Sequence, residues 1–165
     1  MEMESLKDLY IEGLKDLYSA ENQIVKALPA MIKKAQSPEL KQAFTKHLQQ
    51  TKEHAARIER ICDDLGESPR GKKCHGMEGL IQEAKELISE KPEPEVLDAG
   101  MISAAQHVEH YEMAGYGTVR TYATLLGMDK HATLLQRTLD EEKETDELLS
   151  NLAESTVNLE AAEAA

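Results

Sequence analysis

"YSAENQIVKALPAMIKKAQS", residues 18–37, has the pattern of a helix whose apolar stripe is interrupted by a carboxylate. Apolar residues recur at three- and four-residue steps, as in a helix with one buried face: Leu14, Leu17, Ile24, Leu28 and Met31. Glu21 stands between Leu17 and Ile24, where the pattern would place another leucine. An ionised carboxylate alone in a core costs several kcal/mol or is neutralised by a proton. The remaining sequence must therefore supply a partner for Glu21.

Composition favours one all-α domain. The chain has 165 residues, which is enough for one domain with a sizeable core. Aromatic residues make up only 4%, whereas good helix formers such as Ala, Leu, Glu, Lys and Met dominate. The 31 acidic and 19 basic residues give a net charge of −12, which would repel nucleic acid and anionic membranes. Nucleic-acid binding is therefore disfavoured.

The sequence predicts a cytoplasmic protein without membrane contact. Its first residues, MEMESLKDLYIEG, form neither a basic leader nor an apolar run, and no stretch approaches the ~18 apolar residues of a membrane span. Cys62 and Cys74 are expected to be reduced thiols, because two cysteines without an export signal indicate a reducing compartment. A metal site of Cys62, Cys74 and His75 is a weaker alternative, since it lacks the paired spacing of a zinc site.

Periodicity predicts four long helices, over residues 4–36, 38–65, 94–126 and 130–154. The first two are joined by "AQSPEL" (35–40), where Ser37 can cap a helix that begins at Pro38. The last two are joined by "LGMDKH" (126–131), with Gly127 as the stop and Asp129 as the cap. Connections this short predict two antiparallel hairpins.

Residues 66–93 form a long crossover between the two hairpins. The ends of this segment are rich in Gly and Pro, and its middle, 76–89, has the pattern of a short amphipathic fifth helix. Two hairpins joined by one long crossover are the arrangement of the ferritin-like four-helix bundle. We therefore predict a single ferritin-like domain over residues 1–165, with an Ala/Glu-rich tail at 156–165 that frays.

The two hairpins carry matching polar positions. A constant offset of 91 residues aligns three pairs: Glu21 with Glu112, Thr51 with Glu142, and His54 with Thr145. Di-metal carboxylate bundles use a Glu from each of two helices and a Glu-x-x-His from each of the other two. Here the Glu-x-x-His motif is split, because its His survives in the first half and its Glu in the second.

Two neighbouring acids could replace the ligands that the threonines remove. Glu109 precedes Glu112 by three residues and Asp146 follows Glu142 by four, so each shares a helix face with its neighbour. Glu21, His54, Glu112 and Glu142 all lie ~20 to 26 Å from a hairpin turn, at the middle of the bundle. The candidate metal ligands are Glu21, His54, Glu109, Glu112, Glu142 and Asp146. His47, one turn before Thr51, is a weaker candidate as a ligand or as a supporting residue.

Several carboxylates buried at one level require cations, and two divalent or trivalent metals would stabilise this cluster. Oxygen-rich ligation with one histidine favours iron, two per chain, with manganese as the alternative. Taken singly, each residue has a plainer explanation: Glu21 could extend towards solvent, His54 could be a hydrogen-bonded core imidazole, and Glu109 or Asp146 could be solvated. Solvated helix faces are the prediction for Glu53, Glu141 and Glu144, and packing is the prediction for Tyr18, Tyr111, Tyr116 and Tyr122.

Five stretches of the chain resemble the bacterial ferritin-like YciE/YciF family, long described as a domain of unknown function. They are "LYSAENQIVKALPAM", "HLQQTKEHAARIERI", "KCHGMEGLIQEA", "EHYEMAGYGTVRTYATLLG" and "LLQRTLDEEKETDELLSNLA", which together cover nearly the whole chain. The resemblance implies a ferritin-like bundle, a homodimer, a di-iron centre and a role in bacterial stress responses. The departures from ordinary ferritins and rubrerythrins are Thr51 and Thr145, which hold a Glu and a His position of the usual motif.

Two functional hypotheses follow. The first is a di-metal protein that oxidises Fe(II) or consumes peroxide, because two carboxylate-bridged metals can cycle charge. The second is a non-enzymatic stress or interaction module in which any metal is structural, and a cage for iron storage is a weaker third. Hydrolase and kinase chemistry are set aside, since the sequence lacks a Ser-His-Asp arrangement and a Gly-rich phosphate loop. The sequence identifies no reductant, and no partner beyond a second copy of the chain.

Overall fold

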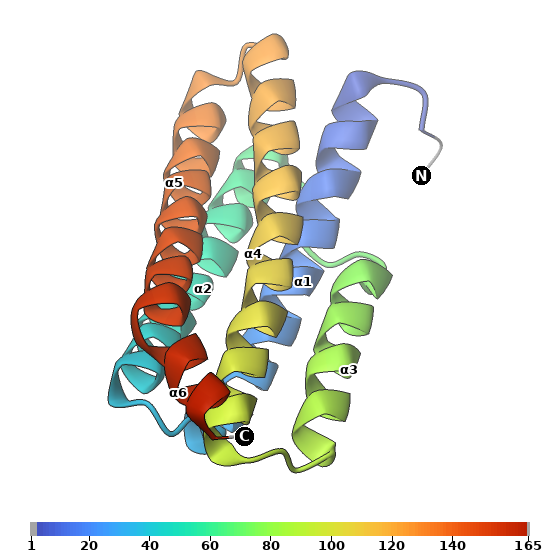
Figure 1. Cartoon of the computed structure of the whole chain (residues 1–165). Coiled ribbons are helices and arrows are strands. Elements are labelled where there is room, and N and C mark those ends of the chain that lie inside the picture. Colours follow the sequence, from blue (N-terminus) through green and yellow to red (C-terminus); the bar gives the residue numbers. More distant parts are fainter. Residues whose placement is uncertain (1–2, 165) are drawn as a thin grey trace.

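The computed structural model describes residues 3–164, and four long helices form its bundle (Figure 1). They are α1 (Leu6–Lys34), α2 (Pro38–Leu65), α4 (Pro94–Leu125) and α5 (Asp129–Leu152). The first hairpin, α1 and α2, packs against the second, α4 and α5, so that α1 lies beside α4 and α2 lies beside α5. The predicted all-α, ferritin-like bundle of two hairpins is confirmed.

Caps explain where the first hairpin begins and turns. The Ser5 hydroxyl accepts from the Asp8 amide and the Asp8 carboxylate accepts from the Ser5 amide, so α1 begins at Leu6, two residues later than predicted. The helix ends at Lys34, also two residues before the predicted end. The buried carboxylate of Asp98, from α4, accepts from the amides of Gln36 at 2.9 Å and Ser37 at 2.7 Å. Ser37 then caps α2, as predicted.

The second hairpin turns at Gly127, whose φ of 71° lies in the left-handed region that glycine adopts without strain. The predicted cap is wrong by one residue. Asp129 is the first residue of α5, and Met128 occupies the cap position without a side-chain hydrogen bond.

The crossover carries α3 (His75–Ser89), which packs on the outer side of α1 and α4 (Figure 1). Cys74 caps this helix, and its Sγ accepts from the Met77 amide at 3.5 Å. Cys62 and Cys74 are both buried and are not joined to each other. Within residues 3–164, no helix is long and apolar enough to cross a bilayer.

The segment after α5 was expected to fray from residue 156, but it is helical. One π-helical stretch, η1 (Ala153–Val157), leads into α6 (Asn158–Glu163), which packs against α4. Leu149, Ala153 and Val157 recur at four-residue steps and are buried in the core. This continued apolar stripe, which the Ala/Glu-rich composition masks, holds the segment on the bundle.

A polar layer divides the apolar core into two clusters along the bundle. One cluster includes Leu17, Ile58 and Val119, and the other includes Ile24, Phe44 and Leu149. Between them, at every long helix, the core positions are occupied by polar residues: Glu21, His47, Thr51, His54, Glu109, Glu112, Glu142 and Thr145. The middle of the core is therefore polar and contributes little apolar burial to stability.

Candidate metal centre

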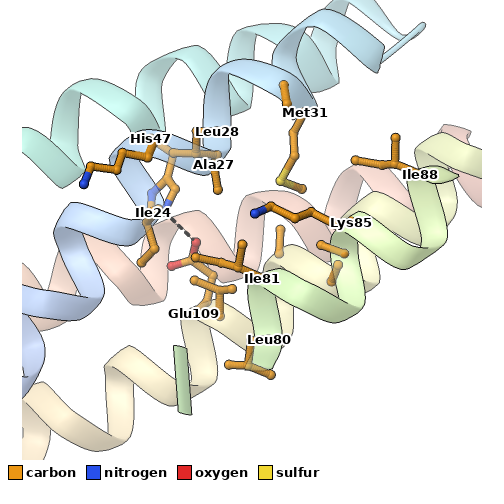
Figure 2. Close-up of a pocket in the computed structure, with 16 residues that line it drawn as sticks. Ile24, Ala27, Leu28, Met31, His47, Leu80, Ile81, Lys85, Ile88 and Glu109 are labelled. Atoms are coloured by element: carbon orange, nitrogen blue, oxygen red, sulfur yellow. Dashed lines mark ion pairs between the residues drawn. The ribbon is translucent and has the colours of Figure 1, made fainter. Parts of the chain in front are cut away.

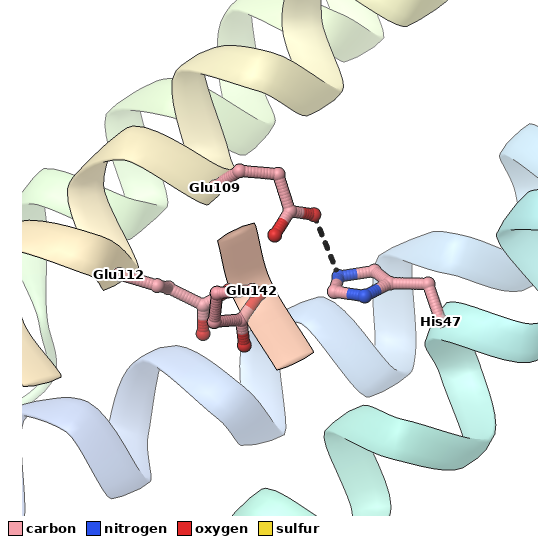
Figure 3. A group of neighbouring side chains, drawn as sticks. All are labelled: His47, Glu109, Glu112 and Glu142. Carbon is pink, nitrogen blue, oxygen red and sulfur yellow. Dashed lines mark ion pairs between the residues drawn. The ribbon is translucent and has the colours of Figure 1, made fainter. Parts of the chain in front are cut away.

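Six side chains in the polar layer carry metal-binding atoms. The exposed fraction is 0% for four of them, 1% for Glu109 and 3% for His47. Every long helix contributes: Glu21 comes from α1, His47 and His54 from α2, Glu109 and Glu112 from α4, and Glu142 from α5. The side chains of His47, Glu109, Glu112 and Glu142 point towards one another from α2, α4 and α5 (Figure 3).

The six side chains form two groups that share Glu142. One group contains His47, Glu109, Glu112 and Glu142, and the other contains Glu21, His54 and Glu142. Within each group the potential ligand atoms lie within 4.8 Å of one another, which is a suitable spacing for one cation. Glu142 belongs to both groups, and its two oxygens are enough to contribute one to each.

Hydrogen bonds between the six residues do not satisfy their polar atoms. His54 Nδ1 lies 2.8 Å from Glu142 Oε1 and 3.4 Å from Glu21 Oε1, and His47 Nε2 lies 3.0 Å from Glu109 Oε1. These approaches are close but poorly directed, so His54 Nδ1, both nitrogens of His47 and both oxygens of Glu112 and Glu142 lack hydrogen-bond partners. Native proteins rarely leave such a group of buried acceptors unsatisfied. The donor set therefore fits cations better than it fits internal hydrogen bonding.

The composition of the cluster matches that of a di-metal carboxylate centre. Four Glu and two His are the ligand inventory of the motif with one Glu on each of two helices and a Glu-x-x-His on each of the others. His47 and Glu109 supply the two ligands that Thr51 and Thr145 lack at the usual positions. Both threonine hydroxyls donate within their own helix, Thr51 to the His47 carbonyl and Thr145 to the Glu141 carbonyl. Two divalent cations would balance the four carboxylate charges.

The pKa shifts reflect an excess of buried negative charge. Burial raises the pKa of Glu109 and of Glu142 to about 7, and neighbouring carboxylates add to the effect at Glu142. The pKa of Glu112 is raised well above its usual value for the same two reasons. Burial alone would lower the pKa of His54, but Glu21 and Glu142 raise it to about 11. Without a cation the cluster therefore holds protons, which metal binding would have to displace.

Glu141, Arg57 and Thr138 fix the orientation of His54. The Nε2 of His54 lies 2.9 Å from Glu141 Oε2, while Arg57 donates to both Glu141 oxygens at 2.7 and 3.0 Å and to Thr138 Oγ1 at 3.0 Å. Burial alone would raise the pKa of Glu141, but Arg57 and His54 lower it to about 2. An ionised Glu141 that accepts from Nε2 leaves Nδ1 free to face the cluster, as in carboxylate–histidine–metal triads. The prediction that Glu141 is a solvated residue is wrong.

Tyr116, from α4, contacts Glu21 at the edge of the cluster and orients its carboxylate. The Tyr116 side chain is fully buried and its hydroxyl donates a hydrogen bond to Glu21 Oε1. Burial raises the pKa of Tyr116 well above its usual value, so this hydroxyl keeps its proton. The predicted packing role holds, and the hydroxyl also anchors Glu21 Oε1, the oxygen that lies 3.4 Å from His54 Nδ1.

The structure brings together five of the six predicted ligands and places Asp146 elsewhere. Asp146 Oδ2 lies 3.2 Å from His110 Nε2, and Gln106 donates to Asp146 Oδ1 at 3.2 Å. Four residues advance about 40° around a helix beyond a full turn, which carries Asp146 from the core face to the edge of the bundle. His47 takes the sixth position. The sequence signal for it was its spacing of seven residues from His54, which returns to nearly the same helix face.

Comparisons with known proteins place the chain in one family. The family model described as Domain of unknown function (DUF892) matches residues 5–162. Protein YciF of Escherichia coli (strain K12) is 43% identical over 162 residues, covering 98% of each chain. The crystal structure of the E. coli stress protein YciF has a TM-score of 0.90 at 44% identity, covering 94% of this chain and 99% of that one. YcfI of Rhodopseudomonas palustris, described provisionally as a structural protein, has a TM-score of 0.87 at 41% identity, covering 90% and 95%.

Proposed function

Because this chain belongs to the DUF892 family, with the stress protein YciF among its relatives, we propose that it is a stress-associated metalloprotein with two cations at mid-bundle. The observation that carries the proposal is the set of unpartnered imidazole and carboxylate atoms that converge in a fully buried layer. Apolar residues of similar volume in this layer would leave the stability of the fold unchanged or raise it. A bound ion is therefore the best explanation for the buried polar groups.

Iron is the proposed metal, with manganese as the alternative. Four carboxylates and two imidazoles are hard and borderline donors, and their number exceeds the four ligands that zinc prefers. One bound pair of such ions supplies one-electron redox chemistry towards peroxide or dioxygen. We therefore propose that the protein oxidises Fe(II) or consumes peroxide at this centre.

The residues of the chain would hold and shield this centre. Glu142 would bridge the two positions, His54 would bind through Nδ1 while Glu141 holds its Nε2 proton, and Glu21 would be oriented by the Tyr116 hydroxyl. The apolar clusters above and below exclude bulk water, which strengthens every charge interaction within the layer.

Anaerobic loading with Fe(II), followed by peroxide or air, tests the proposed oxidation. The absorbance of Fe(III) measures the rate. We expect the loaded protein to form Fe(III) at least ~10 times faster than free Fe(II) does, which corresponds to an activation barrier lower by about 1.4 kcal/mol. Glu21→Ala should abolish the acceleration, whereas Glu53→Ala, which removes an exposed carboxylate beside His54, should retain it. Equal rates for the protein, the Glu21→Ala variant and free Fe(II) would refute the activity.

A structural role is the second candidate, and the provisional description of the R. palustris relative as a structural protein favours it. In that case metal would raise the thermal stability of the protein without any oxidation of Fe(II). The homodimer is likewise a proposal, and sedimentation equilibrium tests it: a dimer is expected, whereas a large closed assembly would instead support an iron-storage cage.

A further inference from the structure

An apolar pocket of about 110 Å³ lies between α1, α3 and α4. Small side chains from all three helices leave this space: Ala27, Ala84, Ala104 and Ala105. Larger apolar residues, including Met31 and Ile81, complete the walls (Figure 2). An apolar cavity of ~150 Å³ holds a molecule of benzene, so this somewhat smaller pocket has room for part of an alkyl chain, with the remainder at its opening.

One wall of the pocket belongs to the candidate metal centre. His47 and Glu109 line the pocket and face each other across 3.0 Å (Figure 2). The layer behind them contains three further carboxyl groups, those of Glu21, Glu112 and Glu142, so in the absence of metal this end disfavours an anion. An alkyl chain in the pocket would therefore present its apolar end, and not an anionic one, to the metal centre.

The outer rim of the pocket carries two exposed lysines, Lys26 from α1 and Lys85 from α3. Figure 2 shows Lys85 extending from α3 across the pocket. Lys15 and Lys73 form ion pairs with carboxylates, but Lys26 and Lys85 have no such partner among residues 3–164. In a chain with a net charge of −12, two free ammonium groups at an apolar opening are a local site for an anionic group.

The geometry points to a binding site for an aliphatic carboxylate, with its alkyl chain among the alanines and its carboxylate between Lys26 and Lys85. The apolar wall supplies the affinity for the chain, and the charge difference between the rim and the metal centre fixes its direction. This inference goes beyond the proposed metal chemistry and is independent of it, because binding is measured in the presence of a chelator.

Calorimetric titration of the full chain with octanoate in EDTA tests the site. We expect octylammonium, with the same chain and a cationic head, to bind at least ~10-fold more weakly, which corresponds to about 1.4 kcal/mol. Lys85→Glu and the pocket-filling Ala84→Leu should each weaken octanoate binding at least ~10-fold, whereas Lys143→Glu, an exposed charge reversal on α5, should not change it. Octanoate should also shift the ring resonances of His47.

Three results would overturn the assignment. The first is octanoate affinity that is unchanged in both Lys85→Glu and Ala84→Leu, because binding would then lie elsewhere. The second is equal affinity for octanoate and octylammonium. The third is no binding of octanoate by the wild-type protein; if that protein is a dimer and its Ala84→Leu variant is a monomer, a second copy of the chain covers the pocket. Lys85→Glu changes only an exposed residue, so its result does not depend on repacking.

Discussion

Glu112→Met is predicted to stabilise the metal-free protein while removing metal binding. Glu112 is 0% exposed and neither of its oxygens has a hydrogen-bond partner. Leaving a buried polar group unsatisfied costs about 1–3 kcal/mol, and methionine is an unbranched side chain of comparable length that adapts to irregular space. The variant should therefore gain about 1–3 kcal/mol in unfolding free energy. For a chain of this size that gain corresponds to a Tm higher by roughly 3–9 °C.

Thermal unfolding followed by circular dichroism, in EDTA and with Mn(II), measures both effects. Mn(II) at 100 times its Kd should stabilise the wild-type protein by about 2.7 kcal/mol for each occupied position, and the variant should lose most of that increase. Asp98→Asn is the matched control, because Asp98 is a buried carboxylate whose oxygens accept from the amides of Gln36 and Ser37. This control should lower the stability by about 1–3 kcal/mol and leave the response to Mn(II) intact.

A metal-free Glu112→Met protein that is less stable than the metal-free wild type would refute the reasoning, because the carboxylate would then be a net stabiliser without a cation. An unchanged response to Mn(II) would refute the assignment of Glu112 as a ligand.

The remaining predictions concern pH, orientation of His54 and packing. In EDTA, stability should fall as the pH rises from 4.5 to 7, because the pKa values of Glu109 and Glu142 are raised from 4.5 to about 7 and the folded state keeps protons that the unfolded state releases. With saturating Mn(II) the slope over this range should have the opposite sign, because the bound ligands are deprotonated, and denaturant titrations at several pH values measure both slopes. Arg57→Ala should weaken metal affinity about 10–100-fold through loss of the Glu141 orientation, measured by competition with a chelator, and an unchanged affinity would contradict the triad. Gly115→Ala should lower stability by no more than about 2 kcal/mol, because a Cβ there would lie 2.7 Å from Leu17 Cδ2 and this overpacking, at about 1–3 kcal/mol, exceeds the gain of about 1 kcal/mol in helix propensity. Chemical denaturation measures the loss.

Much of the fold could be predicted because its signals are local. Ser37 and Pro38 mark the start of α2, because serine caps a helix and proline suits its first position. Gly127 marks the stop after α4, because glycine adopts the left-handed conformation without strain. The spacing of apolar residues marks the buried faces. The start of α1 at Leu6 and its end at Lys34 depend on Asp8 and on Asp98. The first forms a local cap with Ser5, whereas the second makes a contact across 62 residues that no periodicity shows.

The candidate site could be predicted in part, because register fixes the level of a residue in the bundle but not its direction. Glu21, His54, Glu109, Glu112 and Glu142 follow from the match between the hairpins. Asp146 lies at the correct level but is rotated to the edge of the bundle, where His110 is its partner. Glu141 depends on Arg57 from another helix, so its burial and ionisation could not be inferred from its own neighbours.

Elemental analysis of the purified protein, loaded with iron and passed through a desalting column, tests the central claim most directly. We expect about two iron atoms per chain, as in di-metal carboxylate bundles, and a marked loss in Glu142→Ala, because Glu142 belongs to both groups. The exposed variant Glu53→Ala should retain the wild-type content. Less than about 0.2 metal per chain in the wild-type protein, where a folded site of this kind should be saturated, would contradict the account.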